Sequence, residues 1–243
     1  MDDAALYNGK QLDLREKMTD IVAGMEPCDQ FKGLVSIRRF HEPLDVSGIP
    51  RTQTFRSFLF QRTTNVPPPI ERVAFHDPFL VCYSSGTTGI PKAIVHSVGG
   101  VLSSFTKEGR LHEDSGPDTV ALQYTTTGWI MYIASVTALG LGARVVLYDG
   151  SPFQPDLSTF VRLVGDLRCT KLGVSPRWMH ELAKAGLNPR ELTDLSALRT
   201  VSSTGMVLSE QLFEWFYDKG FPAHVQLANI SGGTDIVSSF ADR

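Results

Sequence analysis

From residue 78 onward, short apolar runs alternate with longer segments in which apolar residues recur at helical spacing. The short runs predict strands over residues 79–83, 120–124, 144–148, 171–174, 198–203 and 225–230. The longer segments, begun by Ser97, Asp156, Ser175-Pro176 and Ser209, predict helices over residues 98–105, 157–167, 177–185 and 210–217. This alternation predicts an α/β fold with a mainly parallel sheet flanked by helices.

The first part of the chain has a different pattern. It predicts a helix near residues 12–25, a strand over 33–40, a short helix near 54–61 and a Pro-rich extended connector over 65–70. We therefore expect two parts: residues 1–78, a partial N-terminal subdomain with its connector, and residues 79–243, an α/β subdomain.

One segment is long enough to cross a bilayer, because residues 119–143 contain no charged side chain. Its glutamine, threonines, serine and glycines would be unfavourable in lipid. A strand, a loop and a buried helix explain the segment better, so we expect no membrane span.

Composition and charge narrow the class of protein. The chain has 42% hydrophobic and 20% charged residues, a net charge of -3 and no long basic run, so we expect a globular protein without a nucleic-acid partner. Its three cysteines lack CxxC spacing and indicate reduced thiols, and its charged start lacks the apolar core of a signal peptide. The six histidines never fall at i, i+3 or i, i+4, which disfavours a histidine metal site. We expect a cytoplasmic location.

The candidate chemistry follows the predicted strand of residues 79–83. Nine residues, Ser84-Ser-Gly-Thr-Thr-Gly-Ile-Pro-Lys92, hold four hydroxyls, two glycines and one lysine, a composition that suits phosphate binding. The spacing is not that of a Walker A motif, which disfavours an ordinary P-loop nucleotidase. Taken alone, such a loop can also be a flexible surface turn.

The longer segment of residues 83–96, Tyr-Ser-Ser-Gly-Thr-Thr-Gly-Ile-Pro-Lys-Ala-Ile-Val-His, resembles the signature loop of the adenylate-forming (AMP-dependent synthetase/ligase) superfamily. Residues 123–132, with Gly128-Trp129, resemble its second core segment, and Ser231-Gly-Gly-Thr-Asp235 resembles the segment that contacts the α-phosphate. Residues 145–152 and 229–236 add a resemblance to the acetoacetyl-CoA synthetase branch. The likeness is strong after residue 75 and weak before it.

The resemblance implies roles for individual residues. It implies catalytic roles for Lys92, Thr234 and Asp235, with Asp235 also holding Mg²⁺ where the family usually has glutamate. It implies that the nucleotide contacts Ser84, Ser85, Gly86, Thr87, Thr88, Gly89, Lys92, Gly205, Met206, Val207, Gly233 and Thr234. It implies an acyl pocket formed by Trp129, Ile130, Met131, Thr204 and Gly232. Met206 and Val207 depart from the Gly-Glu-Pro that the family often has at this turn.

The family fold implies part of a large N-terminal domain and a two-step reaction: a carboxylate and ATP give acyl-AMP and pyrophosphate, and CoA then displaces AMP. The implied small molecules are therefore a carboxylate, ATP, Mg²⁺ and CoA. Gly232 and Gly233 stand where acetate-specific relatives carry a bulky aromatic, so the pocket is wide and acetoacetate is favoured.

Family members continue beyond this sequence into a ribose-binding aspartate and a C-terminal lid domain with a catalytic lysine. The chain therefore resembles an internal fragment, and we expect weak nucleotide binding and little ligation by it alone. Two alternatives stay open. A noncatalytic nucleotide-binding pseudoenzyme would bind ATP without acid-dependent exchange. A partner-binding fragment would ignore nucleotide and self-associate through an exposed apolar patch.

Overall fold

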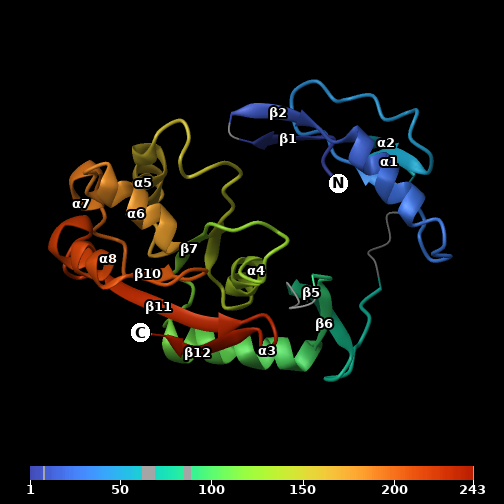
Figure 1. Ribbon diagram of the computed structural model, residues 1–243. Helices are drawn as coiled ribbons and strands as arrows, with labels where there is room; N and C mark the ends of the chain where they lie inside the picture. The colour runs from blue at the N-terminus through green and yellow to red at the C-terminus, as the bar shows by residue number, and fades with distance from the viewer. Residues whose placement is uncertain (8, 62–68, 85–88, 243) are drawn as a thin grey trace. The chain divides into compact units, whose positions relative to one another are not determined.

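The computed structural model describes residues 1–7, 9–61, 69–84 and 89–242 (Figure 1). The chain divides into two compact units, Met1–Glu71 and Arg72–Arg243. Residues 65–68 of the predicted connector lie outside the described residues. The unit boundary follows this connector and precedes the boundary that we expected after residue 78.

The first unit is small and has its own core of Met18, Val22, Leu34, Val46 and Ile49. Its elements are β1 (Ala4–Tyr7), β2 (Lys10–Asp13), α1 (Arg15–Gly24), β3 (Leu34–Ser36), β4 (Thr52–Thr54) and α2 (Phe55–Phe60). The predicted helix of residues 12–25 begins later than expected, because β2 pairs with β1 in an antiparallel ladder that takes up residues 10–13. The predicted strand of residues 33–40 is shorter, since only β3 pairs with β4.

The second unit is built on a six-stranded sheet with the order β12-β11-β10-β9-β7-β8. Its strands are β7 (Val120–Gln123), β8 (Arg144–Val146), β9 (Lys171–Val174), β10 (Thr200–Ser203), β11 (Gln226–Gly233) and β12 (Ser238–Asp242). All neighbouring pairs are parallel except β11 and β12. The predicted α/β fold with a mainly parallel sheet is confirmed, and five of the six predicted apolar runs supply its parallel strands.

The sixth run is a strand of a different sheet. β5 (Pro78–Ser84) pairs antiparallel with β6 (Lys92–Ser97) and forms a separate two-stranded sheet. Residues 92–96, which resemble part of the signature loop, are thus a strand, because Ala93-Ile-Val95 has a partner close along the chain and an antiparallel pair needs only a short connection. The candidate phosphate loop therefore joins the two strands of a hairpin.

Helices fill the connections between the strands of the second unit. They are α3 (Val98–Lys107), η1 (Glu108–His112), α4 (Tyr132–Gly140), α5 (Leu157–Asp166), α6 (Pro176–Lys184), α7 (Pro189–Leu192), α8 (Glu210–Trp215) and η2 (Phe216–Gly220). The predicted start signals are confirmed at α3, α5 and α8, where Ser97, Asp156 and Ser209 accept hydrogen bonds from backbone N–H groups of the first turn. Residues 119–143 form β7, a loop and α4, as predicted. Among the described helices, none combines the length and apolar character that crossing a bilayer requires.

The two faces of the six-stranded sheet differ. Because side chains alternate along a strand, Leu172, Val174 and Val201 point to one face and pack with α5, α6 and α8. This core includes the fully buried rings of Phe160 and Trp178, which pack edge to face. The other face lies under α4, which contacts β7 and β8. Figure 1 shows α5, α6 and α8 gathered on one side of the sheet and α3 on the other.

Candidate functional site

A cavity of about 400 Å³ lies on the face of the sheet that α4 covers. Three segments that are far apart in sequence line it together: residues 129–131, 204–205 and 232–234. Residues 204–205 directly follow β10, and residues 232–234 close β11. In parallel α/β sheets, ligands bind at the carboxyl ends of the strands, and the three segments meet at that edge.

The turn after β10 brings its backbone close to an indole ring. Gly205 has a φ of +92°, and a Cβ at this position would lie 3.4 Å from Cη2 of Trp129. Glycine is the residue that adopts this left-handed backbone without strain. Trp129, which is 36% exposed, thus stands at the mouth of the cavity beside Thr204 and Gly205.

The segment after β11 approaches its neighbour even more closely. A Cβ on Gly232 would lie 2.5 Å from the carbonyl oxygen of Ser238, whereas a Cβ on Gly233 would meet nothing within 3.8 Å. A register shift between Ser231 and Gly232 accompanies this close approach of β11 and β12. Gly232 therefore serves strand packing, and Gly233 leaves open space beside the cavity.

Thr234 and Asp235 lie in the turn between β11 and β12. Thr234 lines the cavity, while Asp235 is exposed and does not line it. The ring Nε2 of His96, on β6, lies 2.8 Å from the carbonyl oxygen of Thr234. Because that oxygen can only accept, the imidazole nitrogen donates. The contact ties the strand that begins at Lys92 to the turn that carries Thr234.

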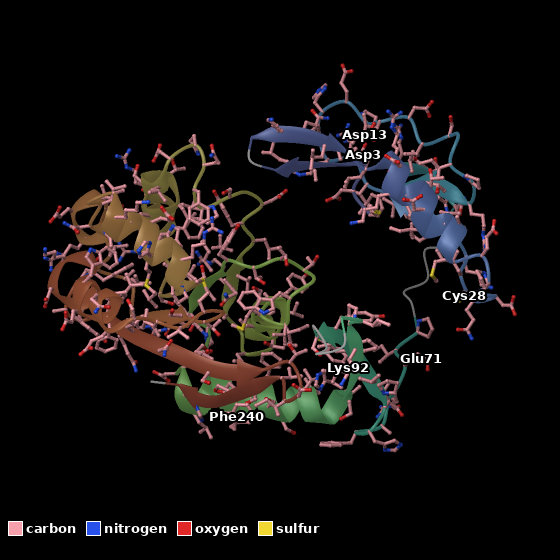
Figure 2. The ribbon with its side chains drawn as sticks, in the orientation of Figure 1. Asp3, Asp13, Cys28, Glu71, Lys92 and Phe240 are labelled. Atoms are coloured by element: carbon pink, nitrogen blue, oxygen red, sulfur yellow. The ribbon has the colours of Figure 1, made fainter. Side chains whose placement is uncertain are left out.

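The residues that flank the candidate phosphate loop belong to the hairpin of β5 and β6. Ser84 ends β5 and pairs in register with Lys92, the exposed first residue of β6 (labelled in Figure 2). Gly89, with a φ of +84°, lies between them. Ser85, Gly86, Thr87 and Thr88 lie outside the described residues. Neither Ser84 nor Lys92 lines the cavity.

Two of the predicted nucleotide contacts lie on the surface beyond the cavity. Met206 is 59% exposed and Val207 is 93% exposed, and neither lines the cavity. Their exposure leaves them accessible to a ligand at the edge of the sheet.

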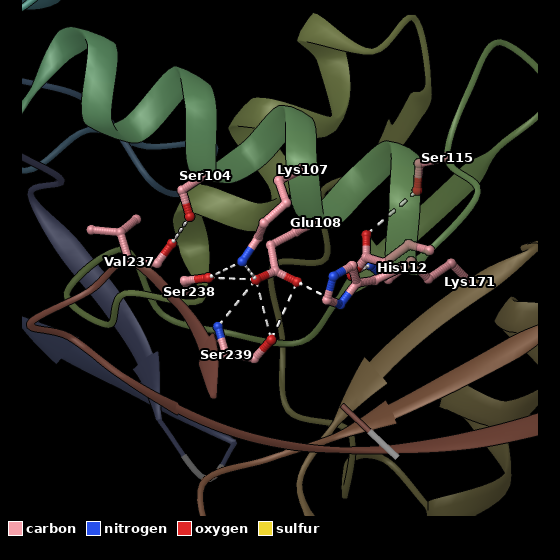
Figure 3. Close-up of polar contacts among 10 residues, drawn as sticks. Ser104, Lys107, Glu108, His112, Ser115, Lys171, Val237, Ser238 and Ser239 are labelled. Atoms are coloured by element: carbon pink, nitrogen blue, oxygen red, sulfur yellow. Dashed lines mark hydrogen bonds and ion pairs between the residues drawn. The ribbon is translucent and has the colours of Figure 1, made fainter. Parts of the chain in front are cut away.

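The cavity wall also carries charged groups that no sequence motif indicates. Glu108 lies at the start of η1 and retains 15% of its side-chain exposure. Its carboxylate accepts from Nζ of Lys107 at 2.8 Å, from Oγ of Ser239 at 3.2 Å and from Oγ of Ser238 (Figure 3). Burial raises the pKa of this carboxyl, but these hydrogen bonds and the charge of Lys107 outweigh burial and lower the pKa to about 2.

A second charged pair lines the same cavity. Lys171, the first residue of β9, forms an ion pair with Glu113, and their side chains are 16% and 22% exposed. The cavity therefore runs along the sheet from the carboxyl ends of the strands toward their amino ends. No local sequence signal marks this pair, because the two residues come from separate elements; for Glu108 the nearest signal is the i, i+4 spacing to His112.

The described residues contain no group of three His, Cys, Asp or Glu side chains that could hold a metal ion. Asp235 is therefore a single carboxylate near the cavity. Such a group fits Mg²⁺ only where phosphates and waters supply the other ligands, which is the usual arrangement for this ion.

Comparison with known proteins adds an independent observation. The family model described as AMP-binding enzyme matches residues 19–240. The chain is 39% identical over 240 residues to the acetoacetyl-CoA synthetase of Gallus gallus and 42% identical over 240 residues to the acetoacetyl-coenzyme A synthetase of Rhizobium meliloti (strain 1021). Each alignment covers 98% of this chain and 36% of the relative.

A solved structure, acetoacetyl-CoA synthetase from Streptomyces lividans, matches the fold with a TM-score of 0.83 at 34% sequence identity. The match covers 99% of this chain and 36% of that chain. The chain thus spans little more than a third of the length of the relatives it matches.

Proposed function

Because the chain belongs to the AMP-binding enzyme family, we propose that it provides the core of an acid–thiol ligase that activates a short-chain carboxylate with ATP. Acetoacetate is the favoured acid, since it is the acid named for the relatives described above. The observation that carries the proposal is the meeting of residues 129–131, 204–205 and 232–234 at one cavity.

The proposed reaction has two steps. A carboxylate oxygen attacks the α-phosphorus of ATP, the bond to pyrophosphate breaks, and an acyl-adenylate forms. The CoA thiol then attacks the acyl carbon, and AMP leaves. Negative charge builds on the phosphates in the first step, so donors and a cation already in place there lower the barrier.

The residues proposed for the site fit these demands. Lys92 is exposed and follows the hydroxyl-rich loop, so its ammonium group can stabilise the leaving pyrophosphate. Thr234 lines the cavity and can orient the α-phosphate beside the acid. Asp235 would hold Mg²⁺ together with the phosphates, and the ion would neutralise phosphate charge.

The cavity supports an acid longer than acetate. Its volume is about 400 Å³, and Gly233 adds no side chain to narrow it. Each additional buried methylene contributes about 0.8 kcal/mol to binding. Acetoacetate is longer than acetate, so it would bury more of its surface in the cavity and bind more tightly.

The first half-reaction is the test, because the residues assigned above are those that would contact ATP and the acid. Pyrophosphate exchange into ATP is measured with and without acetoacetate for the wild-type chain and for Lys92→Ala. Lys184→Ala is the matched control, since Lys184 is an exposed lysine at the end of α6, on the opposite face of the sheet. We expect Lys92→Ala to lose exchange and Lys184→Ala to retain it.

The outcomes separate the proposal from its alternatives. Acetoacetate-dependent exchange above the acid-free blank supports the ligase, even at a rate far below that of a complete enzyme. ATP binding that Lys92→Ala weakens, without any exchange, favours the noncatalytic pseudoenzyme. Absence of ATP binding, together with concentration-dependent association, favours the partner-binding fragment.

A further inference from the structure

The turn between β11 and β12 contains a strained residue. Val237 has a φ of 49°, in the left-handed region that β-branched residues almost never adopt. Its side chain is only 7% exposed and packs against Val101 and Ile133. A conformation of this kind persists only where the surroundings enforce it, and such residues gather at functional sites.

Two hydrogen bonds hold the backbone of this turn from outside. Oγ of Ser104, on α3, donates to the carbonyl oxygen of Val237 at 2.8 Å. Nε2 of His96, on β6, donates to the carbonyl oxygen of Thr234 at 2.8 Å. Both ends of the turn are therefore fixed by the same stretch of chain, which runs from β6 directly into α3.

Glu108 anchors the strand that leaves the turn. Its carboxylate accepts from the backbone N–H of Ser239 at 3.3 Å, from Oγ of Ser239 at 3.2 Å and from Oγ of Ser238 (Figure 3). Lys107 and His112 flank the same carboxylate, with Nζ at 2.8 Å and Nδ1 at 3.4 Å. A half-buried carboxylate that accepts this many bonds is held in one place, because each bond lost would leave its charge poorly solvated.

We propose that Glu108 is a positioning residue that, together with Ser104, clamps the turn of residues 234–237 and thereby keeps Thr234 at the cavity. The proposal rests on the proposed function, because Thr234 is there the group that orients the α-phosphate. The consequence of the proposal is mechanical coupling. The chain runs from Lys92 at the start of β6 through α3 to Glu108. The strand β6 and the turn that carries Thr234 would therefore move together.

The test compares Glu108→Gln with Asp156→Asn. The first removes the charge and turns one acceptor into a donor that faces other donors. The control removes a carboxylate that also accepts several hydrogen bonds, but at the start of α5 on the other face of the sheet. Amide hydrogen exchange of the full chain is followed at residues 236–239 and, as an internal reference, in β9 and β10. The affinity for ATP is measured in parallel.

We expect Glu108→Gln to speed exchange at residues 236–239 by at least about tenfold, to leave β9 and β10 unchanged and to weaken ATP binding, while Asp156→Asn changes none of these. Ser104→Ala, which removes only the bond to Val237, should reproduce the effect more weakly and covers the case in which Glu108→Gln does not fold. Unchanged exchange at residues 236–239 in both variants overturns the clamp.

The same measurements distinguish failure of the ligase proposal from failure of the clamp proposal. If the wild-type chain binds no ATP, the proposed nucleotide role of Thr234 is wrong, while amide hydrogen exchange still decides whether Glu108 clamps the turn. If the wild type binds ATP and Glu108→Gln loosens the turn without any loss of affinity, the coupling to Thr234 is overturned and the ligase proposal stands.

Discussion

Two neighbouring glycines at the cavity offer a sharp test of how the site is built. An alanine at Gly232 would place its Cβ 2.5 Å from the carbonyl oxygen of Ser238 and 3.3 Å from Cα of Ser239. An alanine at Gly233 would find its nearest neighbours at 3.9 Å. Neither glycine has a left-handed backbone, so the two substitutions differ in steric surroundings and in little else.

The expected magnitudes follow from these distances. Ordinary contacts of a Cβ lie at 3.4–4 Å, so Gly232→Ala forces the backbone of β12 away from β11. Overpacking of this kind costs about 1–3 kcal/mol. Replacing glycine by alanine also restricts the unfolded chain, which returns about 0.4–1 kcal/mol. We therefore expect Gly232→Ala to lower the free energy of unfolding by about 1–2 kcal/mol and Gly233→Ala to leave it unchanged or raise it slightly.

Urea unfolding followed by tryptophan fluorescence measures this difference. All three tryptophans lie in the second unit, so the signal reports the unit that contains the cavity. Gly233→Ala serves as the control for the loss of glycine flexibility. Equal midpoints for the two variants would refute the close approach of β11 and β12 at Gly232, because only that contact distinguishes them.

Three further predictions concern charge, thiol reactivity and packing. The pKa of Glu108 is lowered from 4.5 to about 2, so the stability that wild type has over Glu108→Gln should be complete above about pH 5 and fall as the pH drops toward 2. Urea titrations at pH 6 and 3 should show a loss of about 1–2 kcal/mol after screening by water, and a difference that does not change with pH would contradict the assignment. Burial raises the pKa of Cys169 to about 11, so alkylation of the native chain at pH 8 should label Cys28 and spare Cys169, as peptide mass analysis would record. Phe160→Ala, at a fully buried ring, should cost about 3–5 kcal/mol in urea unfolding, whereas Phe240→Ala, at a ring that is 77% exposed, should change it by less than about 0.5 kcal/mol.

The parallel sheet could be predicted because its signals are local. Most of the apolar runs are separated from the next by a helix with its own start signal, and hydroxyl or carboxylate side chains such as Ser97 and Asp156 cap these helices as expected. The hairpin of β5 and β6 was missed although its two strands are close along the chain. Residues 92–97 stand directly before a helix start, and their strand character depends on a partner that single-residue preferences do not specify.

In the candidate site, too, some residues could be identified from the sequence and others could not. Residues 129–131, 204–205 and 232–234 could be identified from their resemblance to family segments, and the cavity brings them together. Glu108 could not, because its partners Ser238 and Ser239 lie 130 and 131 positions further along the chain. A carboxylate at the end of a helix is ordinary in sequence, and only the folded chain sets it against the turn that carries Thr234.

The cavity and the main core share the same strands, and this limits which positions of the cavity wall can vary. Leu172 points into the core under α5 and α6, while its neighbour Lys171 lines the cavity on the opposite face together with Ala121. Because side chains alternate, a substitution on the cavity face leaves the core packing untouched as long as it keeps the strand straight. The size of the cavity can therefore vary at positions such as Ala121 without a change in the core under α5 and α6. The turn of residues 234–237 has no such freedom, since its strained backbone depends on α3 and on Glu108.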